Sequence, residues 1–134
     1  MKLNEFLKNY KIDYSANRIG LTDISHYEEM LDTKMGQQLR NYLVTYGYIG
    51  FKHIELLGIN SLQLQNSDLI RVTLRLRQTN PELNSLIAVE NQGDGDYFLV
   101  DSNDQMYRYI LDSRKLTELS IDLESYIANR LIDA

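Results

Sequence analysis

The segment from residue 90 to residue 109 reads ENQGDGDYFLVDSNDQMYRY. It places four aspartates, two glycines and three tyrosines close together. The aspartates could hold a metal ion or supply an acid/base pair. Alternatively, the segment is a tight turn, a strand, a second tight turn and another strand. The choice decides whether the chain is an enzyme, a metal protein or a binding module.

Metal binding can be tested against the spacing of possible ligands. An EF-hand loop needs alternating oxygen ligands, then a glycine and a closing glutamate. A frame that starts at Asp101 has Met106 where the glycine belongs and Asp112 in place of the glutamate. A frame that starts at Asp94 meets Phe98 at a ligand position. The sequence therefore predicts no metal site and no cofactor.

An acid/base pair drawn from Asp94, Asp96 and Asp101 remains an alternative. Glycosidase-type chemistry needs two carboxylates in different environments, one of them with a raised pKa. Elsewhere the chain has no nucleophile or zinc motif, and its two histidines, His26 and His53, belong to no such pattern. We therefore predict a non-catalytic protein and keep a carboxylate enzyme as the weaker hypothesis.

The requirements of tight turns explain the same glycines and aspartates without any catalytic role. Gly93 and Gly95 permit positive φ, and Asp94 and Asp96 can bond to their own backbone in the turn. Asp101 can do the same at the far end of the strand. The segment then reads as turn, strand, turn and strand.

The flanking residues extend this pattern into an antiparallel meander. SLIAVEN at 85–91, DYFLVD at 96–101 and MYRYIL at 106–111 read as three strands joined by short polar turns. Apolar residues at helical spacing between 121 and 131 predict a closing helix, with Ser120 and Asp122 as candidate caps.

The N-terminal half has helical periodicity. We expect a first helix over residues 3–10 and a second that begins near Thr22, with a capping box formed by Ser25 and Glu28. A third helix is expected over residues 35–46, with Gly47 at its C-terminal cap. FKHIELLGI at 51–59 reads as one strand. Residues 67–79 fit strand and helix periodicity equally. Helices followed by a hairpin series indicate an α+β fold with an antiparallel sheet.

Composition limits the classes of function. The 134 residues suit one domain, 1–134, and the absence of cysteine excludes disulfides, thiolate metal sites and a cysteine nucleophile. A net charge of −5, with only Arg71, Arg75 and Arg77 as a basic cluster, argues against nucleic-acid binding. No apolar segment is long enough for a signal peptide or a membrane span. We expect a cytoplasmic protein with no membrane or nucleic-acid partner.

Three segments together resemble the SUKH superfamily, which is named for the Smi/Knr cell-wall regulators and their bacterial relatives. They are LTDISHYEEML at 21–31, QLRNYLVTYG at 38–47 and LIAVENQGDGDYFLVDSNDQMYRY at 86–109. The positions that match the family pattern are Ile24 and Glu28 in the first helix, Leu39, Tyr42 and Leu43 in the second, and Gly93, Asp94, Gly95, Asp96 and Asp101 in the turn and strand.

The resemblance implies a single SUKH-like domain with an antiparallel-rich sheet packed against N-terminal and C-terminal helices, and a helix over 67–79. Bacterial members are typically immunity proteins that bind and neutralise a cognate toxin without catalysis. Fungal members imply the alternative of an adaptor or regulatory module. Interfaces favour tyrosine, and acidic residues can steer a basic partner. The expected partner-binding residues are Tyr46, Tyr48, Asp94, Asp96 and Asp104. The oligomeric state stays open.

Overall fold

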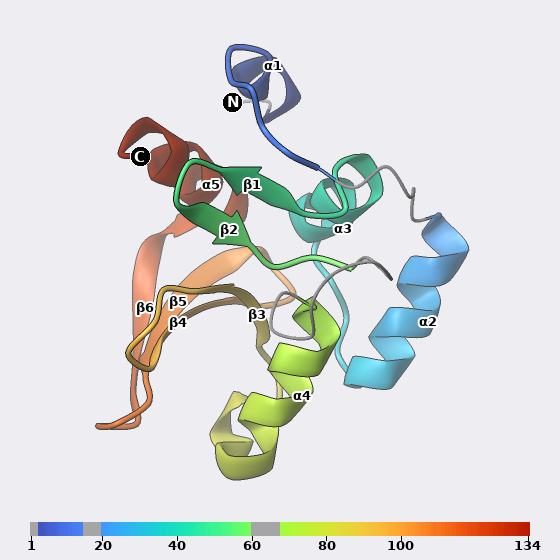
Figure 1. Cartoon of the computed structure of the whole chain (residues 1–134). Helices are drawn as coiled ribbons and strands as arrows, with labels where there is room; N and C mark the ends of the chain where they lie inside the picture. Colours follow the sequence, from blue (N-terminus) through green and yellow to red (C-terminus); the bar gives the residue numbers. More distant parts are fainter. Residues whose placement is uncertain (1–2, 15–19, 60–67) are drawn as a thin grey trace.

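The computed structural model describes residues 3–14, 20–59 and 68–134, and its element order confirms the expected α+β fold (Figure 1). The helices are α1 (Leu3–Leu7), α2 (Leu21–Leu31), α3 (Gln37–Thr45), α4 (Leu69–Thr79), the short 3-10 helix η2 (Pro81–Leu83) and α5 (Leu123–Ile132). The strands are β1 (Ile49–Phe51), β2 (Ile54–Leu56), β3 (Ile87–Asn91), β4 (Asp96–Val100), β5 (Gln105–Ile110) and β6 (Lys115–Asp122).

The main sheet is an antiparallel meander in the order β3-β4-β5-β6. Its first three strands confirm the predicted hairpin series. The fourth, β6, was not predicted: no element was assigned to residues 112–120, and the closing helix was expected to begin near residue 121. That helix, α5, begins at Leu123, and the Oδ1 atom of Asp122 accepts a hydrogen bond from the backbone of Ser125 at 2.9 Å. Asp122 is therefore the N-terminal cap, as one of the two candidates predicted.

The single strand expected over 51–59 is instead a hairpin of β1 and β2. Ile49 pairs with Leu56, and Lys52 in the turn has a φ of 54°. The chain leaves β2 beside the main sheet, where the amide of Leu57 donates to the carbonyl of Val89 at 2.8 Å. The hairpin thus covers part of the outer edge of β3.

Helix α4 confirms the helical choice for the ambiguous segment, although residue 67 itself lies outside the described residues. The Oδ1 atom of Asp68 accepts from the amide of Arg71 at 3.0 Å and caps its first turn. Thr73 in this helix accepts a hydrogen bond from the amide of Ala88 at 3.0 Å. The helix therefore covers more of the outer edge of β3.

Three helix boundaries differ from expectation. Helix α1 ends at Leu7, and α3 begins at Gln37. Helix α2 begins at Leu21, and the Oδ2 atom of Asp23 accepts from the amide of Gly20 at 2.9 Å. The predicted Ser25–Glu28 capping box is wrong, because both residues lie inside the helix. Gly47 has a φ of 75° just past α3, as predicted.

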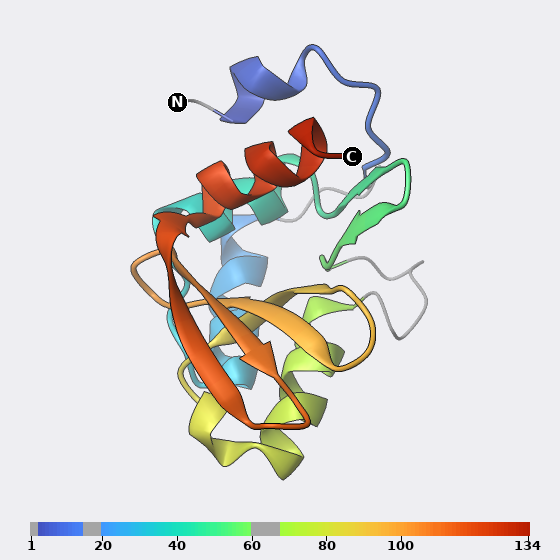
Figure 2. The same ribbon diagram turned by 90° about the vertical axis from the view of Figure 1, so that its left-hand side faces the viewer.

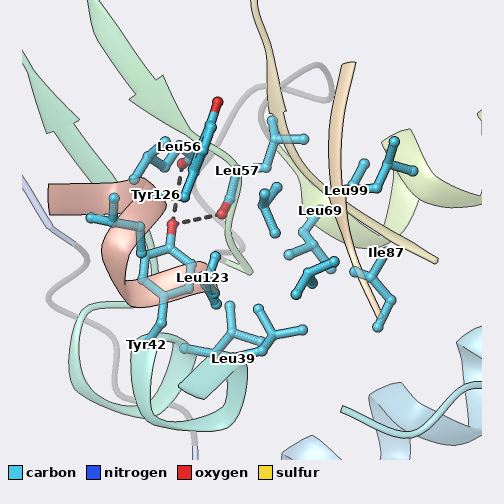
Figure 3. Packing of buried hydrophobic residues seen from close by; sticks show 14 of the residues in the cluster. Leu39, Tyr42, Leu56, Leu57, Leu69, Ile87, Leu99, Leu123 and Tyr126 are labelled. Carbon is cyan, nitrogen blue, oxygen red and sulfur yellow. Dashed lines mark hydrogen bonds between the residues drawn. The ribbon is translucent and has the colours of Figure 1, made fainter. Parts of the chain in front are cut away.

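The apolar core lies between the sheet and the helices. Figure 3 shows side chains of α3, α4, α5, β3 and β4 in one cluster. Tyr42 is buried there, and its hydroxyl donates to the carbonyl of Leu57 at 2.6 Å. Burial raises the pKa of the Tyr42 hydroxyl. Helix α1 packs over α5, as Figure 2 shows, so both ends of the described chain meet on one side.

Candidate protein-binding site

The turn that joins β3 to β4 has the predicted backbone conformation. Gly93 and Gly95 have φ values of 91° and 79°, and Asp94 between them has 54°. The side chain that closes the turn is not Asp94, however. The Oδ1 atom of Asn91 accepts from the amide of Gly93 at 2.9 Å. Asp94 itself is exposed to solvent.

Asp96 does not bond to its own backbone either. It forms a two-pronged ion pair with Arg108 across β4 and β5, at 2.8 Å to Nε and 3.0 Å to Nη2. The hydrogen bonds to Asp96 raise the pKa of Arg108. Because Arg108 is exposed, the pair contributes little to stability.

Asp101 shapes the turn between β4 and β5, as predicted. Its Oδ1 atom accepts from the amides of Asn103 and Gln105 at 2.8 and 3.0 Å, and its Oδ2 atom accepts from the hydroxyl of Tyr107 at 3.1 Å. Burial, followed by this hydrogen bond, raises the pKa of Tyr107. Asp101 is a structural residue of the turn.

Asp104 was expected on a partner-binding surface, but it is only 6% exposed. Its carboxylate accepts from the amides of Gln38 and Leu39, at 3.0 and 3.2 Å, in the first turn of α3. An added Cβ at Gly36 would lie 2.3 Å from its Oδ1 atom, so a glycine is needed for this close approach. A buried cap cannot present its charge to a partner.

The carboxylates do not converge on one reaction centre. Asp96 begins β4 and Asp101 follows its end. Five residues of extended chain separate them by about 16 Å, whereas catalytic pairs lie roughly 5–9 Å apart. Among the described residues, no three histidine or acidic side chains are placed to hold a metal ion. The geometry gives the carboxylate hypothesis no support.

A polar groove lies instead between α1, α3 and α5. It encloses about 370 Å³. The lining residues are Leu3, Asn4, Gln38, Asn41, Tyr42, Thr45, Tyr46 and Glu124. We call this cavity the tyrosine groove, because Tyr46 from the expected partner-binding set lies in it. The other members of that set do not line the groove: Asp94 and Asp96 lie in and beside the β3–β4 turn, Tyr48 precedes β1, and Asp104 is buried.

Tyr46 is held at the groove by two neighbours. Its hydroxyl donates to the Oδ1 atom of Asn4 at 3.1 Å. Its ring meets the ring of Tyr14 edge-on, with centroids 6.3 Å apart, and Tyr14 is 56% exposed. Partial burial raises the pKa of Tyr46. Tyr48 is half-buried near Gly50 in β1, where a backbone bridge joins Asp13 to Gly50. Tyr14 and Tyr46 thus place two contacting aromatic rings beside the groove.

Gln38 organises the floor of the groove and was missed in the sequence. Its side-chain Nε2 atom donates to the Oδ2 atom of Asp122 at 3.0 Å, and its Oε1 atom accepts from the backbone amide of Glu124 at 3.0 Å. Glu124 in turn accepts from the amide of Leu3 at 3.3 Å. Gln38 and Asp122 are 84 residues apart, so only the folded chain reveals this pairing. The groove is therefore lined by amide, hydroxyl and carboxylate groups.

A buried ion pair fixes the helix that forms one wall of the groove. Glu90 in β3 is 2% exposed, and it accepts from Arg130 of α5 at 2.8 and 2.9 Å. The hydroxyl of Tyr126 donates to the same carboxylate at 2.5 Å. Burial, together with the nearby charge of Glu90, raises the pKa of Tyr126, and the hydrogen bond to Glu90 raises the pKa of Arg130.

The remaining matched positions have structural places. Ile24, Leu39 and Leu43 are buried in the core. Glu28 is also buried, and accepts from the amide of Met35 at 2.7 Å and from Arg40 at 3.2 Å. Burial alone would raise the pKa of Glu28, but these hydrogen bonds and the nearby cations outweigh it and lower the pKa. Glu28 ties α2 to the start of α3.

The fold and the groove together define a small α+β domain suited to protein interaction. The chain matches the family model SUKH_5, described as SMI1-KNR4 cell-wall, over residues 3–132. It belongs to this family, which confirms the resemblance drawn from residues 21–31, 38–47 and 86–109. SUKH domains are protein-interacting modules. No curated protein matches the chain. Within the described residues, no helix is long and apolar enough to cross a membrane.

Proposed function

We propose that this protein is an immunity protein that binds a cognate bacterial toxin and neutralises it by occlusion. The observation that carries the proposal is the family match over residues 3–132, because the family is generally composed of non-catalytic immunity or regulatory domains. The fold adds support, since the aspartates that first suggested chemistry are turn, cap or ion-pair residues. The proposal places the protein and its toxin target in the cytoplasm.

The tyrosine groove is the proposed contact surface. Tyrosine is enriched at energetic hot spots of interfaces, and Tyr14 and Tyr46 present their rings at the edge of the groove. Tyr48 extends this surface along β1. The side-chain amide nitrogens of Asn4 and Asn41 can donate to the backbone of a partner, while their Oδ1 atoms accept from Tyr46 and Gln37. Asp94 is exposed at the β3–β4 turn and is proposed as a steering charge for a basic toxin surface, with Asp96 beside it.

A regulatory adaptor is the second candidate. The family description, SMI1-KNR4 cell-wall, is the observation that supports it. An adaptor would use a surface of the same kind, but its partner would not be toxic.

Co-expression with the product of the adjacent gene tests the proposal. We expect a stable complex by co-purification, and we expect the protein to restore growth of cells in which that product alone is toxic. A complex with a non-toxic product would favour the adaptor. A toxic product that neither binds this protein nor loses toxicity would contradict the immunity function.

A further inference from the structure

The two edges of the main sheet differ in how far other parts of the chain cover them. The outer edge of β3 is covered, because Val89 accepts a hydrogen bond from the amide of Leu57 and Ala88 donates one to Thr73. At the other edge, β6 has no strand partner on its outer side among the described residues. Figure 2 shows β6 at the front of the molecule with no helix covering it. An uncovered edge strand is a template for pairing with another chain.

The exposed part of β6 is its first half. Residues 115–118, with the sequence KLTE, are exposed on both faces of the sheet. In the second half, the pairing with β5 is interrupted by a bulge opposite Met106, where the register shifts between Gln105 and Tyr107. Such a bulge protects an edge from pairing, and here it leaves only the first half available. In that half Leu116 is 40% exposed.

We propose that residues 115–118 of β6 pair with the same strand of a second copy, in an antiparallel dimer centred on Leu116. Two antiparallel edge strands in one continuous sheet are related by a two-fold axis perpendicular to the sheet. Directly opposite residues of the two strands have their side chains on the same side of the sheet. The axis therefore lies midway between the two copies of one residue, which we call the centre of the dimer. Within the exposed segment, any of the four residues from Lys115 to Glu118 could be this central residue.

The side chains discriminate among these four centres. A centre at Lys115 or at Glu118 sets like charges opposite each other, which destabilises a pair of strands. A centre at Thr117 places Leu116 against Glu118 of the other copy. A centre at Leu116 places the two leucines together and sets Lys115 of each copy opposite Thr117 of the other, so no like charges meet. Apolar contact and the avoidance of like charges both select the Leu116 centre.

The absence of cysteine from the chain permits a sharp test of this register. In a dimer centred on Leu116, the two Cα atoms of this residue lie about 4.5–5.5 Å apart, within the range of a disulfide bond. The two Cα atoms of Thr117 are offset along the strands and lie about 8 Å apart, which is too far. Leu116→Cys should therefore give a covalent dimer on mild oxidation, and the matched control Thr117→Cys should not.

Sedimentation of the unmodified chain gives a second readout. We expect a concentration-dependent monomer–dimer equilibrium, with a dissociation constant that Leu116→Lys raises roughly tenfold by placing like charges at the axis. Equal cross-linking at residue 117, or a chain that stays monomeric and forms no Leu116→Cys dimer, would overturn the proposal. If the chain is monomeric and Leu116→Lys weakens binding of the adjacent gene's product, the edge serves a strand of that partner instead.

Discussion

Asp104 and Leu39 lie 65 residues apart in the sequence and are joined by a hydrogen bond of 3.2 Å from the Leu39 amide to the Asp104 carboxylate. The contact links the β4–β5 turn to the first turn of α3, where free amides attract an acceptor. The same carboxylate accepts from Gln38. A turn aspartate thus caps a helix that is remote in sequence.

We expect Asp104→Ala to lower the free energy of unfolding by about 1–2 kcal/mol, because the buried amide of Leu39 and the part-buried amide of Gln38 lose their acceptor. Asp94→Ala is a matched control, since Asp94 also has positive φ but is exposed. Urea denaturation followed by circular dichroism measures both. Equal losses in the two variants would show that backbone strain, and not the cap, dominates.

Gly58 lies against the backbone at the end of α3. An added Cβ at this position would lie 1.8 Å from the carbonyl oxygen of Gly47, which accepts from the amide of Ile59 at 3.0 Å. The neighbour is backbone and cannot rotate away, so Gly58→Ala should destabilise the protein by about 3 kcal/mol. At Gly20 an added Cβ meets only Asp23, at 3.6 Å. Gly20→Ala should cost less than about 1 kcal/mol. Thermal melts of the two variants measure the difference, and equal losses would contradict the close approach at Gly58.

Acid should destabilise the protein through Asp122. The hydrogen bond from Gln38, with further bonds from Ser125, lowers the pKa of Asp122 from its ordinary value of 3.8 despite partial burial. Because the pKa is lower in the folded chain than in the unfolded chain, the ionised carboxylate stabilises the fold at pH values above the unfolded-state pKa. This contribution is lost as the pH falls below about 4. The unfolding free energy of Asp122→Asn should therefore depend less on pH than that of the parent. Urea titrations at several pH values between about 2 and 6 measure the difference, and parallel curves would contradict the assignment.

Local chemistry explains which parts of the fold the sequence predicts. The β3–β4–β5 meander follows from turn residues such as Gly93 and Asp101, which act on their immediate neighbours. Strand β6 was missed because it is exposed on both faces in its first half and runs directly into the apolar stripe of α5. The alternation in ELSID, where Leu119 and Ile121 lie between Glu118, Ser120 and Asp122, is the signal that was available.

The site was less predictable, because its contacts depend on the folded chain. Tyr46 was predicted from residue type and lies in the groove, but Gln38 was not, since its partners are 84 and 86 residues away. Asp104 was expected on the surface because a turn aspartate is usually solvated. Its burial arises from the packing of α3 against the turn, which no local pattern encodes.

The proposed contact surface makes a prediction about binding. Tyr46→Ala removes a ring at the groove and should weaken binding of the adjacent gene's product at least tenfold, mainly through faster dissociation. Asp94→Lys should instead slow association and reduce its dependence on salt. Surface plasmon resonance separates the two rates. A Tyr46→Ala variant that folds and binds like the parent, beside a strong loss in Asp94→Lys, would move the interface to the β3–β4 turn.

The Glu90–Arg130 pair and the Asp96–Arg108 pair have similar geometry but different burial, which allows a direct comparison. Glu90 is buried beside Tyr126, so Arg130→Ala leaves a carboxylate inside the protein without its cation. We expect a loss of about 3 kcal/mol in the free energy of unfolding. Arg108→Ala removes the same group from an exposed pair that solvent screens, and should cost much less. Chemical denaturation at neutral pH measures both, and equal costs would show that Glu90 is reached by solvent once its cation is gone.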